Sequence, residues 1–325
     1  MDSPEFLSTS LHTMTCLEVP VHLFGAYCIL FKTPISMKSV KFSMLNLHFW
    51  SVFLDLAISL LTSPYVFFPA LVGKSLGLLE YFNVSIPIQL YLIVTLFPTV
   101  GVSITAILEN RFYLLFARDT FWKYLRIPFL GFLYLASWCC FIPSLLNIPD
   151  QKEALEEILE KMPIILKYAN VTEIFVLSTD YREFFFTLII MIALVTVTSV
   201  TFAFLLHWNM KKRSKLVNVS IHTLHLQKIF FTAIFIQTSM PILILIFPLN
   251  YLAFSMFTEY FNQAINNICF IITAFHGLLS TIIMIIVHKP YREVFYIVFC
   301  EKVLRILKLK EGSVTYSMSS LSRPT

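Results

Sequence analysis

The chain has 325 residues, of which 58% are apolar and only 13% are charged. This charged share is about half of that in an ordinary soluble domain, and a soluble fold of this length has too little core to bury so much apolar surface. A water-soluble protein is therefore excluded, and a chain that lies in lipid is expected. The six cysteines form no Cys-x-x-Cys pair, so neither a structural zinc site nor a dithiol redox site is indicated.

Seven apolar runs are long enough to cross a bilayer as helices, which takes roughly 20 residues each. They cover 14–31, 42–68, 87–110, 127–147, 184–206, 229–251 and 263–287. Because the runs are continuous and do not alternate with polar residues, a β-barrel is excluded. Pro64 and Pro69 are expected to end or bend the second run. The predicted fold class is an all-α membrane protein, a seven-transmembrane helix bundle.

The distribution of Lys and Arg predicts the orientation of this bundle. Nineteen of the 24 basic residues lie in 32–41, 111–126, 207–228 and the C-terminal tail. Loops rich in Lys and Arg remain in the cytoplasm, so the N-terminus is expected outside and the C-terminus in the cytoplasm. The glycosylation sequons at Asn83 and Asn170 then fall in outer loops.

The longest outer loop, 148–183, contains one predicted helix. Asp150 and Glu153 are spaced as an N-terminal capping box, apolar residues follow on one face, and Pro163 ends the pattern. Two interpretations remain open: this segment is a lid over a ligand pocket, or it is a solvated loop packed on the bundle.

A short amphipathic helix is predicted after the seventh span, at about 290–310, lying on the inner leaflet. Pro290 suits its first turn, and Cys300 on it is a candidate palmitoylation site. Residues 1–310 are thus expected to form one domain. The Ser- and Thr-rich 311–325 is expected to be a disordered cytoplasmic tail.

Charged residues at membrane depth are costly and usually functional. Asp55 lies near the middle of the second span, where it either binds a cation or is a structural carboxyl satisfied by a neighbouring Ser or Asn. Glu109 and Arg111 lie at the inner end of the third span. They form either a switchable pair or an ordinary helix end at which the arginine reaches the interface.

No metal site, cofactor or enzymatic activity is expected. The histidines of the spans, His22, His48 and His276, share no ligand spacing and are placed at different depths. No nucleophile elbow, P-loop or pair of carboxylates is found, and no lysine lies within a predicted span to form a retinal-type Schiff base.

Five strings spread over most of the chain are specific enough to suggest a family. They are FGAYCILFKTP at 24–34, MKSVK at 37–41, LNLHFW at 45–50 followed by Asp55, ENR at 109–111 and HKPYR at 288–292. These strings resemble the class H serpentine chemoreceptors (Srh family) of nematodes. The resemblance covers roughly 15–300.

The resemblance implies a G-protein-coupled chemosensory, olfactory-type receptor at the plasma membrane, with a sensory cilium as one location. Its partners would be a small external ligand, a heterotrimeric G protein and membrane lipids, and no nucleic acid. On this reading Glu109, Arg111 and Asp55 form the activation switch. The surface facing the G protein would consist of Arg111, Lys211, Lys212, Arg213 and Lys215.

The ligand would bind in the outer half of the bundle. Candidate polar contacts, chosen by depth alone, are Gln89, Thr95, Thr187, Gln237, Asn266 and Asn267. Receptors of the rhodopsin type usually tie the third helix to the second outer loop by a disulfide. Neither 85–92 nor 148–183 contains a cysteine, so this loop must be held by packing alone or be mobile.

An alternative from another class is a seven-span ligand-gated ion channel of inverted topology, with the N-terminus inside. The bias of Lys and Arg is opposite to the one that this topology requires.

Overall fold

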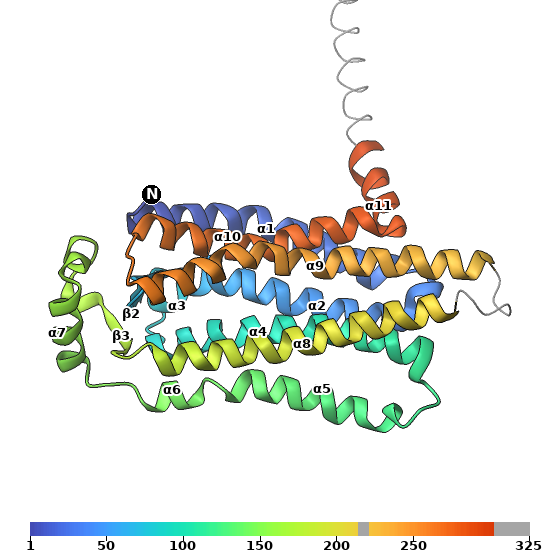
Figure 1. The fold of residues 1–325 in the computed structure, drawn as a ribbon. Helices are drawn as coiled ribbons and strands as arrows, with labels where there is room; N and C mark the ends of the chain where they lie inside the picture. Colours follow the sequence, from blue (N-terminus) through green and yellow to red (C-terminus); the bar gives the residue numbers. More distant parts are fainter. Residues whose placement is uncertain (214–220, 302–325) are drawn as a thin grey trace, which may run out of the picture.

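The computed structural model describes residues 1–213 and 221–301, and its main body is a bundle of seven long helices (Figure 1). The seven are α1 (Pro4–Lys32), α2 (Lys38–Leu56), α4 (Ile86–Phe112), α5 (Trp122–Cys139), α8 (Arg182–Arg213), α9 (Ile221–Thr258) and α10 (Gln263–Val287). Together with the short turns that continue some of them, these helices are long and apolar enough to cross a membrane. The predicted fold class is confirmed.

Smaller elements lie at the two ends of the bundle. They are β1 (Pro64–Val66), β2 (Leu71–Ser75), α3 (Leu78–Tyr81), α6 (Ile142–Leu146), α7 (Gln151–Lys161), β3 (Phe175–Ser178) and α11 (Lys289–Phe295). The end that carries the three strands, α7 and the N-terminus is called the sheet end (Figure 1). The opposite end, with Lys38, Lys41, Arg118, Lys123 and Lys211, is called the basic end.

α4 is the central helix of the bundle. In its most apolar 18-residue stretch 72% of the residues are buried, against 17% in the fourth and fifth spans. The outward faces of those two spans carry exposed aliphatic and aromatic side chains such as Phe132, Leu135, Ile190 and Phe204. Surfaces of this kind suit contact with lipid tails.

Several helices differ in length from the predicted runs. α1 starts at Pro4, capped by Ser3, and not near residue 14. α8 continues to Arg213, and α9 begins at Ile221. Much of the basic segment predicted as a loop at 207–228 is therefore helical. The seventh span matches its prediction. Hydropathy detects only the part of a helix that lies in lipid, so polar helix ends are missed.

The second predicted run, 42–68, ends before Pro64, as predicted from this proline, and residues 64–66 form a strand. α2 passes into a π-helix at Ala57–Thr62, and β1 follows. Ser63 adopts a left-handed conformation, with φ of 39°, and Pro64 has no N–H to continue the helix. The proline disfavours helical geometry in the residue before it, so the chain turns here into a strand.

A three-stranded antiparallel sheet covers the sheet end, and sequence analysis did not predict it. β1 and β2 form a hairpin between α2 and α4, and β3 comes from the loop 148–183 and pairs with β2. Val72 lies opposite Val176, and Gly73 opposite Phe175. Cys16, Cys28, Cys139, Cys140 and Cys269 are all free. Backbone hydrogen bonds between β2 and β3 therefore hold the loop 148–183, which has no cysteine for a disulfide.

Side chains reinforce the ladder. The Gln151 amide donates to the Val176 carbonyl at 3.0 Å and accepts from the Val176 N–H at 2.9 Å. Lys74 Nζ lies 2.6 Å from Glu173 Oε2. The hydrogen bond from Lys74 holds the pKa of the Glu173 carboxyl below its usual range. This surface link is thus present at neutral pH and is lost as the pH falls through that lowered pKa.

The helix predicted within this loop is confirmed. Asp150 caps α7 by accepting from the N–H groups of Lys152 and Glu153, and α7 ends at Lys161, two residues before Pro163. Ala154, Leu155 and Ile158 form its buried face. α7 contacts β3, so the segment packs on the sheet.

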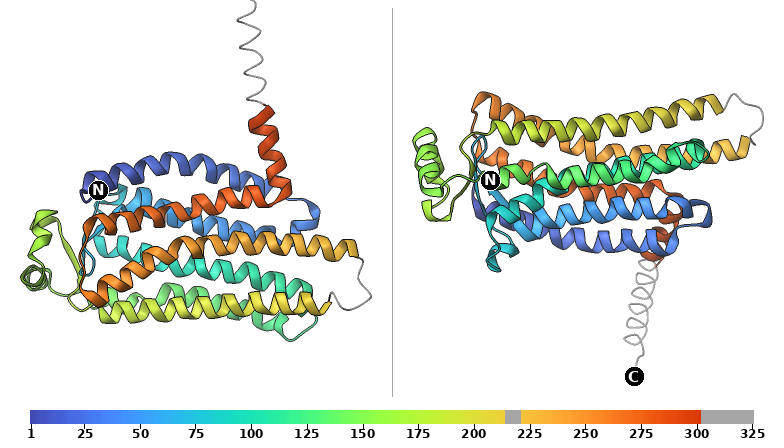
Figure 2. Two further views of the ribbon diagram at one scale, coloured as in Figure 1. Left: turned by 45° about the horizontal axis from the view of Figure 1, so that its top comes forward. Right: turned by 90° about the horizontal axis from the view of Figure 1, so that it is seen from below.

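At the basic end, α11 leaves the bundle at a steep angle to α10 (Figures 1 and 2). Pro290 lies in its first turn, as predicted. The buried Tyr291 hydroxyl lies 2.8 Å from Thr33 Oγ1 and so ties α11 to the end of α1. The described helical segment runs to Glu301; the rest of the predicted helix and the tail 311–325 lie outside the described residues.

We predict that Gln151→Ala loosens β3. Removing the amide leaves the N–H and the carbonyl of the buried Val176 without these partners, which costs about 1–3 kcal/mol for each group left unsatisfied. Hydrogen–deuterium exchange should then be faster in the peptide covering 174–178. The exposed neighbour provides the control, because Lys152→Ala should leave exchange in this peptide unchanged. Equal exchange in both variants would refute the role given to Gln151.

Candidate functional site

A cavity of about 470 Å³ lies beneath the sheet. Its walls come from α4, α8, α9 and α10, and β1, β2 and β3 form its roof. Representative lining residues are Ile93 and Phe97 of α4, Met191 of α8, Leu252 of α9, Phe270 of α10 and Leu177 of β3. Lys74 is the only charged residue among the described lining residues. A concave, mostly apolar space of this size suits a small organic molecule.

Gln89 is the only one of the six predicted pocket residues that lines this cavity. Its amide already has partners: it accepts from Ser75 Oγ at 2.6 Å and donates to the Val84 carbonyl at 2.7 Å. Gln89 therefore anchors the hairpin to the start of α4. Its remaining capacity toward a ligand is small.

The other five predicted pocket residues are not among the lining residues. Asn266 and Asn267 donate to the carbonyls of Phe68 and Met1 and so hold the structure at the sheet end. Gln237 lies 3.0 Å from His288, next to the basic end. Thr95 bonds to the Tyr91 carbonyl of its own helix, and Thr187 is half-buried on α8. Depth alone did not reveal which face of a helix meets the cavity.

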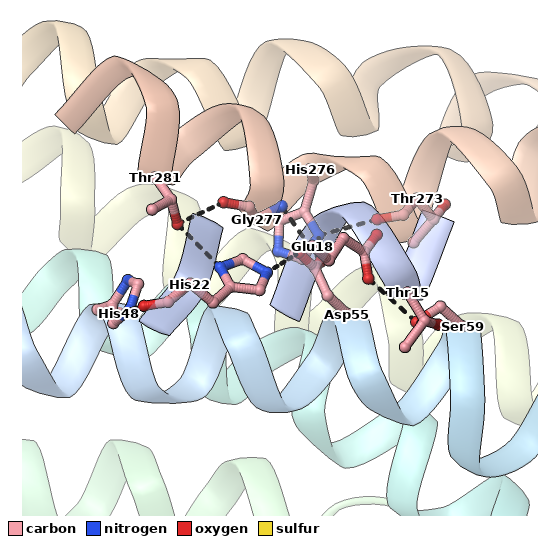
Figure 3. A network of polar contacts seen from close by, with 10 residues as sticks. All are labelled: Thr15, Glu18, His22, His48, Asp55, Ser59, Thr273, His276, Gly277 and Thr281. Carbon is pink, nitrogen blue, oxygen red and sulfur yellow. Dashed lines mark hydrogen bonds and ion pairs between the residues drawn. The ribbon is translucent and has the colours of Figure 1, made fainter. Parts of the chain in front are cut away.

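A buried polar network joins α1, α2 and α10 in the middle of the bundle (Figure 3). The Asp55 carboxylate is its centre and is fully buried. Oδ1 lies 2.7 Å from His276 Nδ1 and accepts from the Gly277 N–H at 3.1 Å. Oδ2 lies 3.2 Å from His22 Nε2. The groups around Asp55 are thus two histidines and a backbone N–H, and its two interpretations, a cation ligand or a structural carboxyl, both remain predictions.

Gly277 makes this arrangement possible. A Cβ at this position would clash with both oxygens of Asp55, so only glycine lets the carboxylate approach the backbone of α10. The same position supplies the N–H that Asp55 accepts. The contact between α2 and α10 thus depends on the carboxylate of Asp55 and on the lack of a side chain at Gly277.

The network contains a second buried carboxyl, Glu18, which sequence analysis missed. Glu18 is fully buried, and its Oε2 accepts from Ser59 Oγ at 3.1 Å. Like Asp55 it is a single charge in an apolar run, and it precedes His22 by four residues. That spacing places both side chains on one helix face and could have identified the pair.

The prediction that the histidines lie at different depths is wrong. His22 and His276 both contact Asp55, and His48 Nε2 lies 3.1 Å from the His22 carbonyl. An apolar run in the sequence does not define the depth of each residue in it, so residues placed at different depths can be neighbours in the bundle. A difference in depth therefore does not exclude a metal site near these histidines.

Glu109 forms its ion pair with Arg126 of α5, and this is a correction to the predicted pair with Arg111. Arg126 Nη2 lies 3.0 Å from Glu109 Oε2 and 3.0 Å from Asn110 Oδ1, and Trp122 Nε1 donates to Glu109 Oε1 at 2.7 Å. Glu109 is fully buried and Arg126 is partly exposed. Trp122 and Arg126 are four residues apart, so one face of α5 holds this carboxylate.

The remaining predicted residues lie at the two ends. Arg111 is half-buried at the basic end of α4, and Lys211 and Lys212 are exposed on the last turn of α8. Arg213 is the last residue of α8, and Lys215 lies outside the described residues. Cys300 belongs to the final helical segment, Tyr296–Glu301. Asn83 and Asn170 are both exposed at the sheet end.

Comparisons with known proteins agree with this architecture. A family model described as "Serpentine type 7TM GPCR chemoreceptor Srh" matches residues 2–301. Serpentine receptor class H-72 of Caenorhabditis elegans is 28% identical over 306 residues, which cover 89% of this chain and 84% of that protein.

Among solved structures, squid rhodopsin is similar in fold, with a TM-score of 0.54. The alignment covers 91% of this chain and 85% of that chain at 11% sequence identity. At that identity the likeness concerns the fold alone: both proteins are seven-helix bundles. A match over nearly the whole chain, on a bundle of this kind, shows that this multi-pass membrane protein belongs to the Srh family of serpentine seven-transmembrane G-protein-coupled chemoreceptors.

Proposed function

We propose that this protein is a chemosensory receptor of the plasma membrane that binds a small apolar or amphiphilic ligand in the cavity beneath the sheet and signals through a heterotrimeric G protein at the basic end. The observation that carries the proposal is the cavity itself, about 470 Å³ in volume and walled by four helices of the bundle. The membership in a chemoreceptor family adds to it.

The chemistry of the walls favours an apolar ligand. Leu, Ile, Val and Phe dominate the lining, while the amide of Gln89 is occupied by its own partners. Affinity would come from burial of apolar ligand surface, at about 25 cal/mol per Å². Selectivity would then depend mainly on the shape of the ligand, because few polar groups are free to read its functional groups.

The sheet end would face outside and the basic end the cytoplasm. The unequal distribution of Lys and Arg supports this orientation, and both exposed sequons, at Asn83 and Asn170, lie at the sheet end. Ligand would then reach the cavity from outside or from the outer leaflet. The basic end, with Lys211 and Lys212 exposed, would present a positive surface to a G protein.

The contact between Glu109 and Arg126 would be the switch at this surface. It joins α4 to α5 in the described state and includes a buried carboxylate, so its loss would be costly unless another state offers new partners. A ligand that favours such a state would shift the equilibrium toward it. Glu109 keeps the switching role predicted for it, with Arg126 as its partner.

We predict that Met191→Trp abolishes or strongly weakens ligand responses, because the larger side chain fills the cavity. The adjacent Ile190 is exposed on the outward face of α8, so Ile190→Trp is the matched control. In reporter cells screened with a panel of small apolar molecules, half-maximal concentrations should rise at least tenfold for Met191→Trp and stay within about twofold for Ile190→Trp. Similar curves for both variants, at equal surface expression, would rule out this cavity as the ligand site.

We predict that Glu109→Gln and Arg126→Ala raise ligand-free G-protein activation about fivefold or more, since a coupling of about 1 kcal/mol changes a two-state equilibrium by that factor. The measurement is guanine-nucleotide exchange in membranes, normalised to receptor amount. Ile127→Ala provides the control, because Ile127 follows Arg126 in α5 and its side chain is 75% exposed. Basal exchange equal to that of the wild type in both variants would show that the pair is only structural.

A further inference from the structure

The hydrogen-bond pattern around His22 determines where its ring carries a proton. Thr281 Oγ1 lies 2.8 Å from the Gly277 carbonyl and 3.1 Å from His22 Nδ1. A carbonyl cannot donate, and a hydroxyl has one proton, so Thr281 donates to Gly277 and accepts from the Nδ1–H of His22. In the neutral ring Nε2 is therefore an acceptor. It faces Asp55 Oδ2, another acceptor, at 3.2 Å.

Glu18 adds a third acceptor at the same place. Its Oε2 accepts from Ser59 Oγ, but Oε1 has no hydrogen-bond donor among the described residues, although Glu18 is fully buried. Ligand atoms of Glu18, His22 and Asp55 lie within 4.8 Å of one another. Figure 3 shows these side chains converging from α1 and α2. Buried acceptors that face one another without a donor are costly, so either a bound cation or an added proton must lie between them.

The donor set favours one class of cation. A neutral imidazole nitrogen and two carboxylate oxygens suit zinc and similar divalent transition metals, whereas calcium takes six to eight oxygen ligands. The two positive charges of a divalent ion would offset the two carboxylate charges, and a site without net charge costs least at membrane depth. With bonds of about 2.0–2.2 Å, the three side chains would have to draw closer together than they lie here.

Hydrogen-bond partners orient the side chains of His22 and Asp55, as is usual for metal ligands. Metal-binding histidines usually donate their second N–H to a neighbouring oxygen, as His22 does to Thr281. The other oxygen of Asp55 is fixed by His276 and by the Gly277 N–H. His276 Nδ1 also lies 2.8 Å from the Thr273 carbonyl. These contacts to Oδ1 thus fix the orientation of the Asp55 carboxylate, whose Oδ2 would bind the metal.

We propose that Glu18, His22 and Asp55 form a binding site for one zinc-class divalent transition-metal ion, with Thr281 and His276 as positioning residues. The ion would link α1 to α2 in the middle of the bundle. The proposal is independent of the ligand cavity and of G-protein coupling. It replaces the expectation, drawn from the sequence, that the chain has no metal site.

The test is metal binding by the full-length protein, purified in detergent without a histidine tag and stripped with a chelator. Titration with Co²⁺ should give the strong visible absorption of tetrahedral cobalt at one equivalent, and Zn²⁺ should abolish it by displacement. Zn²⁺ should also raise the unfolding temperature in proportion to the logarithm of its concentration. Mg²⁺ and Na⁺ at equal concentration should do neither.

Variants locate the site. Glu18→Gln and His22→Gln should each weaken binding at least 100-fold, and Thr281→Val about 10-fold, as loss of an outer partner does. His12→Gln removes an exposed histidine of the same helix and should leave affinity unchanged. If the ligand variants fail to fold, the cobalt spectrum of the wild type still decides.

Two results would overturn the proposal. The first is a wild-type protein that gives no tetrahedral cobalt spectrum, or is stabilised equally by Na⁺; His22 would then be an imidazolium paired with Asp55. The second is undiminished binding in Glu18→Gln or His22→Gln, or its loss in His12→Gln, either of which would place the metal elsewhere.

Discussion

The buried carboxylate of Asp55 is the constraint on which the rest of the bundle depends. It is completely removed from solvent; α10 brings His276 and the Gly277 N–H to its Oδ1, and α1 brings His22 to its Oδ2. A buried charge without such partners would cost several kcal/mol. The positions of α1, α2 and α10 are therefore set together, and a shift of any one would remove a contact of this carboxylate.

Thr273 connects the polar network around Asp55 to the cavity. Thr273 lines the cavity, and its backbone carbonyl contacts His276 Nδ1, which in turn contacts Asp55. A ligand that displaces this part of α10 would disturb the polar network directly. At the other end of α4, the pair of Glu109 with Arg126 holds the basic surface. Of the polar contacts that tie helices together, one thus lies beside the cavity and another at the proposed G-protein surface.

The sheet has the role that a disulfide has in many related folds. It joins the loop before α8 to the hairpin before α4 by backbone hydrogen bonds, and Gln151 locks the third strand to α7. Backbone pairing of three short strands is weaker than a covalent bond and opens more readily. A roof of this kind combines a defined shape with a route by which a ligand could enter.

Long apolar runs, the capping residue of α7 and the lack of outer-loop cysteines were sufficient to predict seven spans, the loop helix and a loop without a disulfide. The sheet could not be predicted, because its strands have only three to five residues and β3 pairs with β2 across more than 100 residues of sequence. The pocket residues chosen by depth failed for a related reason, since hydropathy gives depth but not the face of a helix. The role of Arg126 as the partner of Glu109 was not predicted, because its positive charge was used only to infer the orientation of the bundle. Trp122, one helical turn earlier on the same face, also contacts Glu109.

The central claim is that the sheet end with its cavity faces outside and the basic end faces the cytoplasm. The most direct measurement is antibody access to epitope tags in intact and permeabilised cells, with one tag inserted between α8 and α9 and a matched tag in the loop after α7. The account predicts that the tag after α7 stains in intact cells and that the tag between α8 and α9 stains only after permeabilisation. The reverse pattern would contradict it, remove the proposed G-protein surface, and favour a ligand-gated channel of inverted topology.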